Sequence, residues 1–157
     1  MEAVRTSGKT ALVELRRMLG LLRDDETAGS EGLQPSLGSV PDLAGAVTSA
    51  GTEVCVEQSG TPRPLEPGLD QTCYRIVQEA LTNAMKHAGP ARATVAVRWE
   101  PEAVVLEISD DGVGAGATVG NGRGVVGMRE RVRLYGGELS AGPLPGGGFR
   151  VTARLPV

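Results

Sequence analysis

Four polar residues of different chemistry share one face of a segment with helical spacing near the middle of the chain. At about 100° per residue, Glu79, Asn83, Lys86 and His87 fall within an arc of roughly 100°. An amide oxygen can bind Mg²⁺, and a carboxylate one turn away can orient or deprotonate an attacking group. An amine and an imidazole can bind an anion. The set therefore predicts a site that takes a metal ion and an anion together.

The segment that positions these residues, DQTCYRIVQEALTNAMKHAG, has a nearly solid apolar back. We predict a helix from Asp70 to Gly89, with Asp70 as the N-cap and Gly89-Pro90 as the end. Ile76 is the one apolar residue on the polar side. The opposite side consists of Cys73, Tyr74, Val77, Ala80, Leu81, Ala84 and Met85. His87 has a second interpretation, as a structural histidine with its hydrogen bonds satisfied near the end of the helix, where a partial positive charge is favourable to the helix dipole.

An acidic turn follows a predicted strand at residues 103–109. In Asp110-Asp111-Gly112-Val113-Gly114, a carboxylate could accept a hydrogen bond from the exocyclic amine of a base. The glycines beside it would let the backbone approach a flat ring closely. A plain polar turn is the alternative interpretation of this motif on its own.

A glycine-rich loop precedes the next helical segment, at residues 125–135. Gly120, Gly122, Gly124 and Gly127 could expose backbone N–H groups and the positive helix end to phosphates. Residues 115–124 are small and weakly apolar, so we predict a mobile lid over a ligand. A flexible surface loop is the alternative interpretation.

The remaining elements alternate along the chain. We expect a short helix at 40–50 with Leu43, Ala46 and Val47 facing inward, a strand at 52–58, and two hairpins at 93–109 and 138–155. The order helix, two strands, helix, two strands predicts an α+β fold in which helices cover one face of a sheet.

A separate helix is expected near the start of the chain, at residues 2–25. Leu12, Leu15, Leu19 and Leu22 form a stripe that requires a partner, either the rest of the domain or another helix. The linker-like composition that follows favours an intermolecular bundle.

Composition narrows the functional classes. The 157 residues suit one domain with a short appendage, and the net charge of −3 with four aromatic residues excludes direct nucleic-acid binding. We predict that Cys55 and Cys73 are buried free thiols in a reducing compartment. No apolar run reaches the roughly 18 residues of a membrane span.

These motifs resemble one family. EALTNAMKHA (79–88) resembles the N box, and DDGVG (110–114) and GRGVVGM (122–128) resemble the two glycine boxes, of the ATP-binding catalytic (HATPase) domain of two-component sensor histidine kinases. That domain belongs to the Bergerat-type (GHKL) superfamily of DNA gyrase, MutL and the ninety-kilodalton heat-shock chaperone. The resemblance covers 69–157, and QEALTNAMKHA and GMRERV are similar to the bacterial subgroup paired with helix-turn-helix response regulators.

The resemblance implies a two-layer α/β sandwich with a mixed sheet, binding ATP and Mg²⁺ between the central helix and a mobile lid. It implies that Asn83 binds Mg²⁺, that Glu79 assists phosphoryl transfer, and that Asp110 holds the adenine amino group. The other implied nucleotide contacts are Lys86, His87, Gly112, Gly114, Gly122, Gly124, Val125, Gly127 and Met128.

Two departures from the family pattern stand out. Many relatives have a glycine-threonine pair where this chain has Gly148-Phe149, and Thr152 is too far along the strand to replace that hydroxyl automatically. The only histidine is His87, which is already assigned to the ATP site, so the phosphoacceptor is missing.

We therefore expect a C-terminal fragment of a longer kinase. Residues 1–25 resemble the second helix of a dimerisation and phosphoacceptor domain, 26–38 form a linker, and 39–157 form the ATP-binding catalytic domain. The implied partners are that dimerisation domain and a cognate response regulator, within a homodimer. The resemblance places this domain in the cytoplasm and allows a membrane anchor in a preceding part. The alternatives are an anti-sigma-factor-like serine kinase of the same superfamily and a degenerate domain that only binds partners.

Overall fold

The computed structural model describes residues 34–87, 91–112 and 123–157, and for His87 and Arg123 only the backbone. The described residues belong to one compact unit, Gln34–Val157. The predicted helix at 2–25, most of the linker at 26–38, most of the lid at 115–124, and Gly114, Gly120 and Gly122 lie outside the described residues.

The described elements follow the predicted order closely. They are η1 (Leu37–Ser39), α2 (Val40–Ser49), β1 (Glu53–Ser59), α3 (Pro67–His87), β2 (Arg92–Glu100), β3 (Ala103–Asp110), α4 (Arg123–Leu134), β4 (Glu138–Pro143) and β5 (Phe149–Pro156). The strands form one sheet in the order β1-β2-β3-β5-β4. Only β1 and β2 are parallel, and the other pairs are antiparallel. The predicted α+β fold with a mixed sheet is confirmed.

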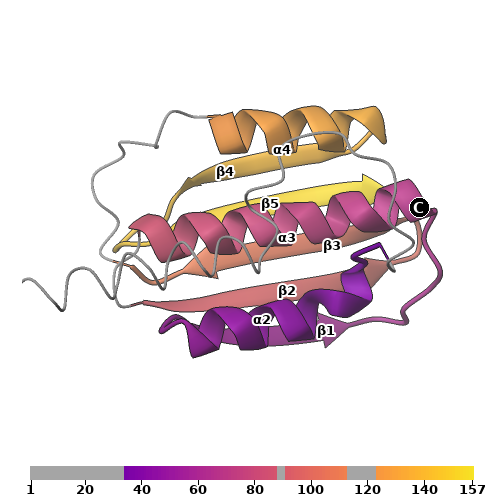
Figure 1. Ribbon diagram of the computed structural model, residues 1–157. Helices are drawn as coiled ribbons and strands as arrows, with labels where there is room; N and C mark the ends of the chain where they lie inside the picture. Colours follow the sequence, from indigo (N-terminus) through magenta and orange to yellow (C-terminus); the bar gives the residue numbers. More distant parts are fainter. Residues whose placement is uncertain (1–33, 88–90, 113–122) are drawn as a thin grey trace, which may run out of the picture. The chain divides into compact units, whose positions relative to one another are not determined.

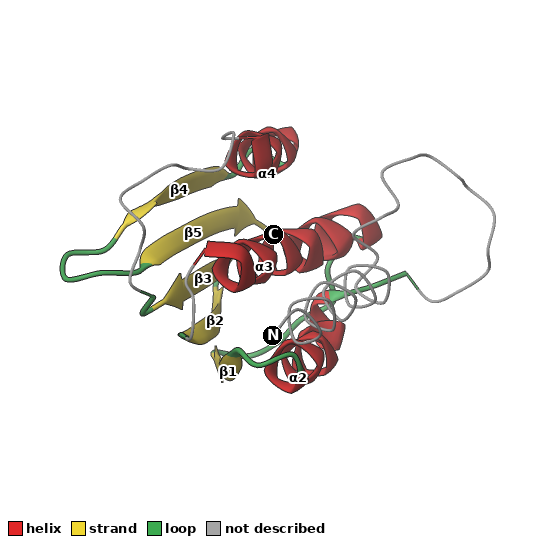
Figure 2. Ribbon diagram, turned by 60° about the vertical axis from the view of Figure 1, so that its left-hand side comes forward, coloured by secondary structure: helices red, strands yellow, loops and turns green. Residues whose placement is uncertain are grey.

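The described α-helices α2, α3 and α4 lie together on one face of this sheet (Figure 1), and the turned view separates the two layers (Figure 2). α3 packs on β2 and β3 and contacts α2 on one side and α4 on the other. Because α3 has neighbours on three sides, its buried surface is wider than an amphipathic stripe. Ile76, predicted on the polar side, is 0% exposed.

The two faces of the sheet differ sharply. On the helix-covered face, Val95, Leu106 and Ala153 have no exposed surface. The other face, which we call the open face, carries charged side chains at alternate positions. Its ion pairs are Arg98–Glu107 at 3.7 Å, Arg150–Glu107 at 3.6 Å, Arg154–Glu100 at 3.2 Å and Arg92–Glu53 at 3.0 Å.

The start of α3 differs from the prediction. The helix begins at Pro67, and the Glu66 carboxylate accepts a hydrogen bond from the Leu69 N–H at 3.0 Å, which is the capping role expected of Asp70. Asp70 lies in the first turn, where its Oδ1 accepts a hydrogen bond from the Leu37 N–H at 2.7 Å. Asp70 therefore joins η1 to α3 instead of capping α3.

Two smaller predictions about burial were wrong. Cys55 is exposed, because the apolar neighbours Val54 and Val56 take the inner positions of the edge strand β1. In α2, Ala46 is exposed, and Ala44 is buried beside Leu43 and Val47. Cys73 is buried as predicted, and both cysteines are free thiols. No helix within the described ranges is long and apolar enough to cross a bilayer.

Candidate functional site

The polar row of α3 meets the beginning of α4. A Cβ atom added to Gly124 would lie 2.4 Å from Oε1 of Glu79 and 3.5 Å from Nδ2 of Asn83. Glu79 and Asn83 are both half-buried. Gly124 thus lies beside Glu79 and Asn83, more than 40 residues earlier in the sequence, and the absence of a side chain at Gly124 permits the close approach.

A second contact, at the C-terminal end of α4, defines the orientation of α4 relative to α3. A Cβ atom on Gly68, in the first turn of α3, would lie 2.3 Å from the Tyr135 hydroxyl oxygen, just after α4 ends. α4 therefore runs antiparallel to α3, with its N-terminus beside Glu79 and Asn83. The positive end of a helix dipole and its unpaired N–H groups point toward this end of the domain, where they favour an anion.

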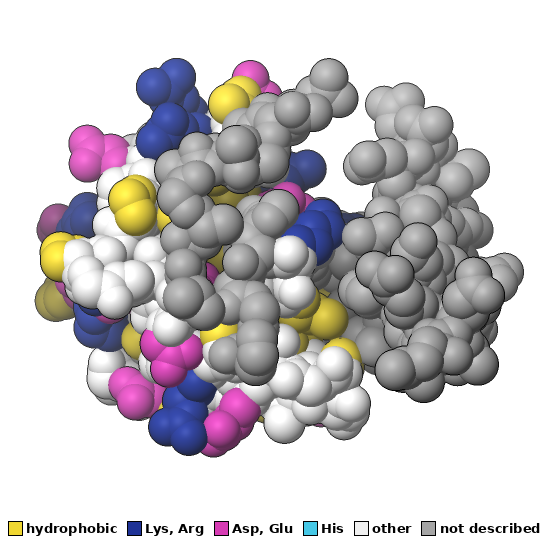
Figure 3. All heavy atoms as spheres, turned by 90° about the vertical axis from the view of Figure 1, so that its left-hand side faces the viewer, with side chains coloured by type: hydrophobic (Ala, Val, Ile, Leu, Met, Phe, Trp, Pro, Cys, Tyr) yellow, Lys and Arg dark blue, Asp and Glu magenta, His cyan; other side chains and the backbone are white. Residues whose placement is uncertain are grey.

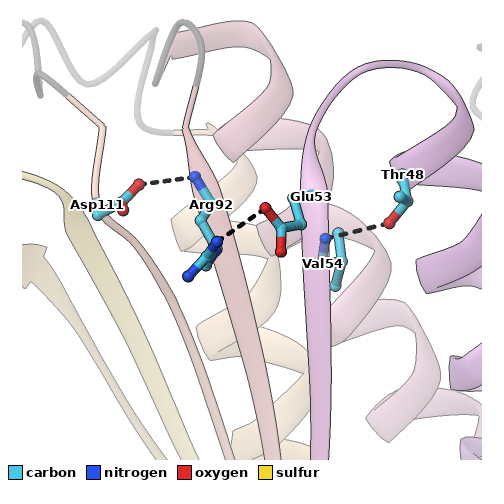
Figure 4. A network of polar contacts seen from close by, with 5 residues as sticks. All are labelled: Thr48, Glu53, Val54, Arg92 and Asp111. Atoms are coloured by element: carbon cyan, nitrogen blue, oxygen red, sulfur yellow. Dashed lines mark hydrogen bonds and ion pairs between the residues drawn. The ribbon is translucent and has the colours of Figure 1, made fainter.

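The two acids of the strand-end turn have different roles, and Figure 4 shows the contacts of the second, Asp111. Asp111 closes the β2–β3 ladder, because its carboxylate accepts a hydrogen bond from the Arg92 N–H at 2.7 Å and its own N–H donates to the Arg92 carbonyl at 3.1 Å. The Arg92 side chain in turn pairs with Glu53. Asp111 is thereby committed to structure, a distinction that the sequence alone did not make.

Asp110 has one carboxylate oxygen that no described donor contacts. Its Oδ1 accepts a hydrogen bond from the Gly112 N–H at 3.0 Å, and no donor in the described part of the chain reaches its Oδ2. Its side chain is half-buried on the helix-covered face, two residues beyond the buried Ile108. A carboxylate held by its own turn and open on one oxygen suits a base amine.

The turn between β4 and β5 supports Asp110 from behind, a contact that the sequence analysis missed. Gly148 has a φ of +86°, and a Cβ there would lie 1.9 Å from the Asp110 carbonyl oxygen. Gly147, with φ +115°, similarly approaches the Gly112 carbonyl. Only glycine fits both the backbone angle and the space. The run Gly146-Gly147-Gly148 was the available signal in the sequence.

The other predicted site residues differ in exposure. Lys86 is exposed near the end of α3, while Gly124, Val125 and Gly127 are half-buried. Met128 is fully buried, so its side chain belongs to the core under α4. Figure 3 views the domain from the end where α4 begins, and basic and acidic side chains alternate over its visible described surface.

Comparison with known proteins identifies the family. A family model described as histidine kinase-, DNA gyrase B-, and HSP90-like ATPase matches residues 68–157, more than half of the chain. The chain belongs to this family. The match begins at the first turn of α3, so this ATPase domain includes the polar row, the acidic turn, α4 and the final hairpin. The predicted ATP-binding catalytic domain is confirmed.

Curated relatives of the ATPase domain are sensor kinases. The chain is 28% identical over 158 residues to the sensor histidine kinase YxjM of Bacillus subtilis, covering 100% of this chain and 37% of the relative. It is 33% identical over 156 residues to the signal transduction histidine-protein kinase/phosphatase UhpB of Salmonella typhimurium, covering 90% and 28%. The chain therefore spans about a third of the length of these relatives.

Solved structures share the fold of this ATPase. The histidine kinase domain of the blue-light activated histidine kinase of Erythrobacter litoralis EL346 matches with a TM-score of 0.59 and 24% identity, over 95% of this chain and 74% of that one. The Acinetobacter baumannii histidine kinase AdeS matches with a TM-score of 0.61 and 15% identity, over 94% and 77%. The predicted histidine-kinase-type fold is thus confirmed.

Proposed function

We propose that this chain binds ATP with Mg²⁺ and transfers the γ-phosphoryl group to a histidine on a dimerisation domain, from which it passes to an aspartate of a response regulator. The observation that carries the proposal is the approach of Gly124 to Glu79 and Asn83. This approach places the positive N-terminal end of α4 beside a carboxylate and an amide. Phosphoryl transfer uses such groups to hold the phosphate charge and to orient the attacking group.

The donor set fits a magnesium ion bound together with phosphates. Within the described ranges, no group of three or more His, Cys, Asp or Glu side chains could hold a metal on its own. Mg²⁺ typically takes only one or two protein oxygens and completes its shell with water and phosphate oxygens. When bound, the ion would neutralise phosphate charge, and Asn83 is the residue that we assign to hold it.

The chain's own residues would do the remaining work by positioning. Glu79 orients the acceptor group and takes its proton, and the N-terminus of α4 with Lys86 and His87 holds the phosphates. Asp110 Oδ2 accepts a hydrogen bond from the base amine. Gly112, Gly114, Gly122, Gly124, Val125 and Gly127 complete the proposed pocket, and Met128 supports it from the core.

Calorimetric titration with Mg²⁺ and a non-hydrolysable ATP analogue tests the proposal. We expect Asn83→Ala to weaken binding at least about tenfold, the equivalent of one charge-assisted contact. The control Gln58→Ala, an exposed site on β1, should leave affinity unchanged. Absence of binding by the folded wild-type protein would refute the ATP site and favour a domain that only binds partners.

A second experiment tests the acceptor. The chain is supplied with a separate dimerisation domain that carries a histidine, and with labelled ATP. We expect acid-labile label on that histidine, and a loss of roughly a hundredfold in rate with Glu79→Gln, because a positioned general base typically contributes about that much. Label on a serine of a partner would instead support the serine-kinase alternative.

A further inference from the structure

Phe149 occupies a distinctive place beside Asp110. The β3–β5 register pairs Ile108 with Val151 and Ser109 with Arg150. Continuing this antiparallel register by one residue places Phe149 opposite Asp110. Because side chains alternate along a strand, both residues lie on the helix-covered face, while Arg150 points to the open face and pairs with Glu107.

The backbone around Phe149 holds it there. Gly148 fits against the Asp110 carbonyl with no room for a Cβ, and the Leu144 N–H donates to the Gly148 carbonyl at 3.0 Å to close the turn. The separation between Phe149 and the Asp110 turn is therefore fixed by two glycines and a hydrogen bond. Because the backbone is fixed here, the Phe149 ring stays near the Asp110 turn in any rotamer.

Burial of Phe149 falls short of that of its neighbours on the same face. Val151, Ala153 and Leu155 are 3%, 0% and 0% exposed, whereas Phe149 is only half-buried. A large aromatic ring left partly open at the end of a closed core, next to a carboxylate with an available oxygen, presents an apolar surface where a flat ligand would contact both.

We propose that the Phe149 ring packs against the same purine base whose amine donates a hydrogen bond to Asp110. Phe149 then increases the affinity for any purine nucleotide, and Asp110 distinguishes adenine from guanine. This inference rests on the proposed ATP site and adds a residue to it. An aromatic face contacts any purine ring, but a carboxylate accepts only from a base that carries a donor at that position. The two residues therefore predict separable effects.

The test is calorimetric titration of the protein with ADP and with GDP in the presence of Mg²⁺. We expect Phe149→Ala to weaken both nucleotides by the same factor, about five- to twentyfold, so that the ADP/GDP ratio stays constant. Asp110→Asn should reduce that ratio. Phe149→Tyr, which keeps the ring, should stay within about twofold of the wild type.

Arg150→Ala is the matched control, because Arg150 is the next residue and lies on the opposite face of the sheet. It should leave both affinities unchanged. Trp99, the only tryptophan, lies at the other end of the β2–β3 pair from Asp110, so its emission reports folding independently of the site. If Phe149→Ala fails to fold, Phe149→Leu replaces it, with a loss of about three- to tenfold for both nucleotides.

Three results would overturn the inference. They are an unchanged ADP affinity in folded Phe149→Ala or Phe149→Leu, an equal loss in Arg150→Ala, or a selective loss of ADP over GDP on removing the ring. If Asp110→Asn still weakens ADP in any of these cases, the ATP site stands and only the role of Phe149 is lost. If the wild type binds neither nucleotide, both the site and the inference fail.

Discussion

On β3, Leu106 is fully buried beneath the helices, whereas Glu107, the next residue, lies on the open face between Arg98 and Arg150. Every strand repeats this contrast to some degree, since the same backbone presents alternate side chains to both faces. The covered face provides most of the burial and carries Asp110 and Phe149 at one end of their strands. The open face carries exposed ion pairs, which stabilise proteins little. Stability and the candidate site therefore share one face.

The largest difference between the faces should appear in thiol reactivity. Cys55 lies exposed on the open face, while Cys73 lies on the buried side of α3, where burial raises the pKa of its thiol to about 12. Because the thiolate is the reacting species, we expect a thiol reagent at neutral pH to label Cys55 on the order of a hundredfold faster than Cys73. Mass spectrometry of timed samples measures both rates, and equal labelling in the folded protein would contradict the buried position of Cys73.

The same thiol gives a pH dependence with a definite sign. The Cys73 pKa is raised above the ordinary thiol value of 9.0, so the folded state keeps the proton to higher pH than the unfolded state. This contribution is fully present below pH 9 and is lost as the pH rises toward 12. Denaturant titrations should therefore show stability falling over that window, and less steeply in a folded Cys73→Ala variant.

Removing apolar volume from the covered face should be the largest single effect on stability. We expect Leu106→Ala to lower the free energy of unfolding by about 2–5 kcal/mol, because it leaves a cavity under α3. Urea denaturation followed by Trp99 emission measures it. Leu134→Ala is the control, since that leucine is 83% exposed on α4. Similar losses in both variants would mean that the helices do not cover this face as described.

A carboxylate within the helix layer, that of Asp70, should contribute an intermediate amount to the free energy of unfolding. Asp70 accepts the Leu37 N–H at 2.7 Å in a partly buried position. We expect Asp70→Ala to cost about 1–2 kcal/mol, with Asp70→Asn recovering part of it because its amide oxygen still accepts. Thermal unfolding of both variants measures the difference, and a neutral Asp70→Ala would show that η1 does not depend on this bond.

The Glu107 carboxylate, on the open face, should contribute least to the free energy of unfolding. We expect Glu107→Gln to change stability by less than about 1 kcal/mol, although Glu107 pairs with two arginines, because both arginines are 47% exposed and the pairs, at 3.7 and 3.6 Å, are screened by salt. Urea denaturation at low and high salt measures it. A loss of stability as large as that of Asp70→Ala would mean that the carboxylate on the open face stabilises the domain as much as the one in the helix layer.

Local patterns predicted most of this architecture. Alternation placed Val104, Leu106 and Ile108 on one face, and helical spacing placed Glu79 and Asn83 together, because both depend only on chain geometry. Cys55 was misplaced although its neighbours Val54 and Val56 already marked the inner face of β1.

Contacts between distant segments were harder to predict. The role of Asp70 depends on Leu37, 33 residues earlier, and the burial of Ile76 reflects an α3 enclosed by β2, β3, α2 and α4. The support of Asp110 by Gly148 needs the β3–β5 pairing, which no local pattern encodes. The distinction between Asp110 and Asp111 has the same origin, since it rests on the partner strand β2.

The position of β5 has a consequence for how the domain is made. β5 is the last strand of the sheet along the chain, yet it lies between β3 and β4. While the ribosome is still producing Phe149–Pro156, β3 and β4 each lack the neighbour that satisfies their backbone hydrogen bonds. Until β5 pairs, β3 therefore has an open edge and β4 has no neighbour in the sheet, and unpaired strands of this kind can pair with other chains.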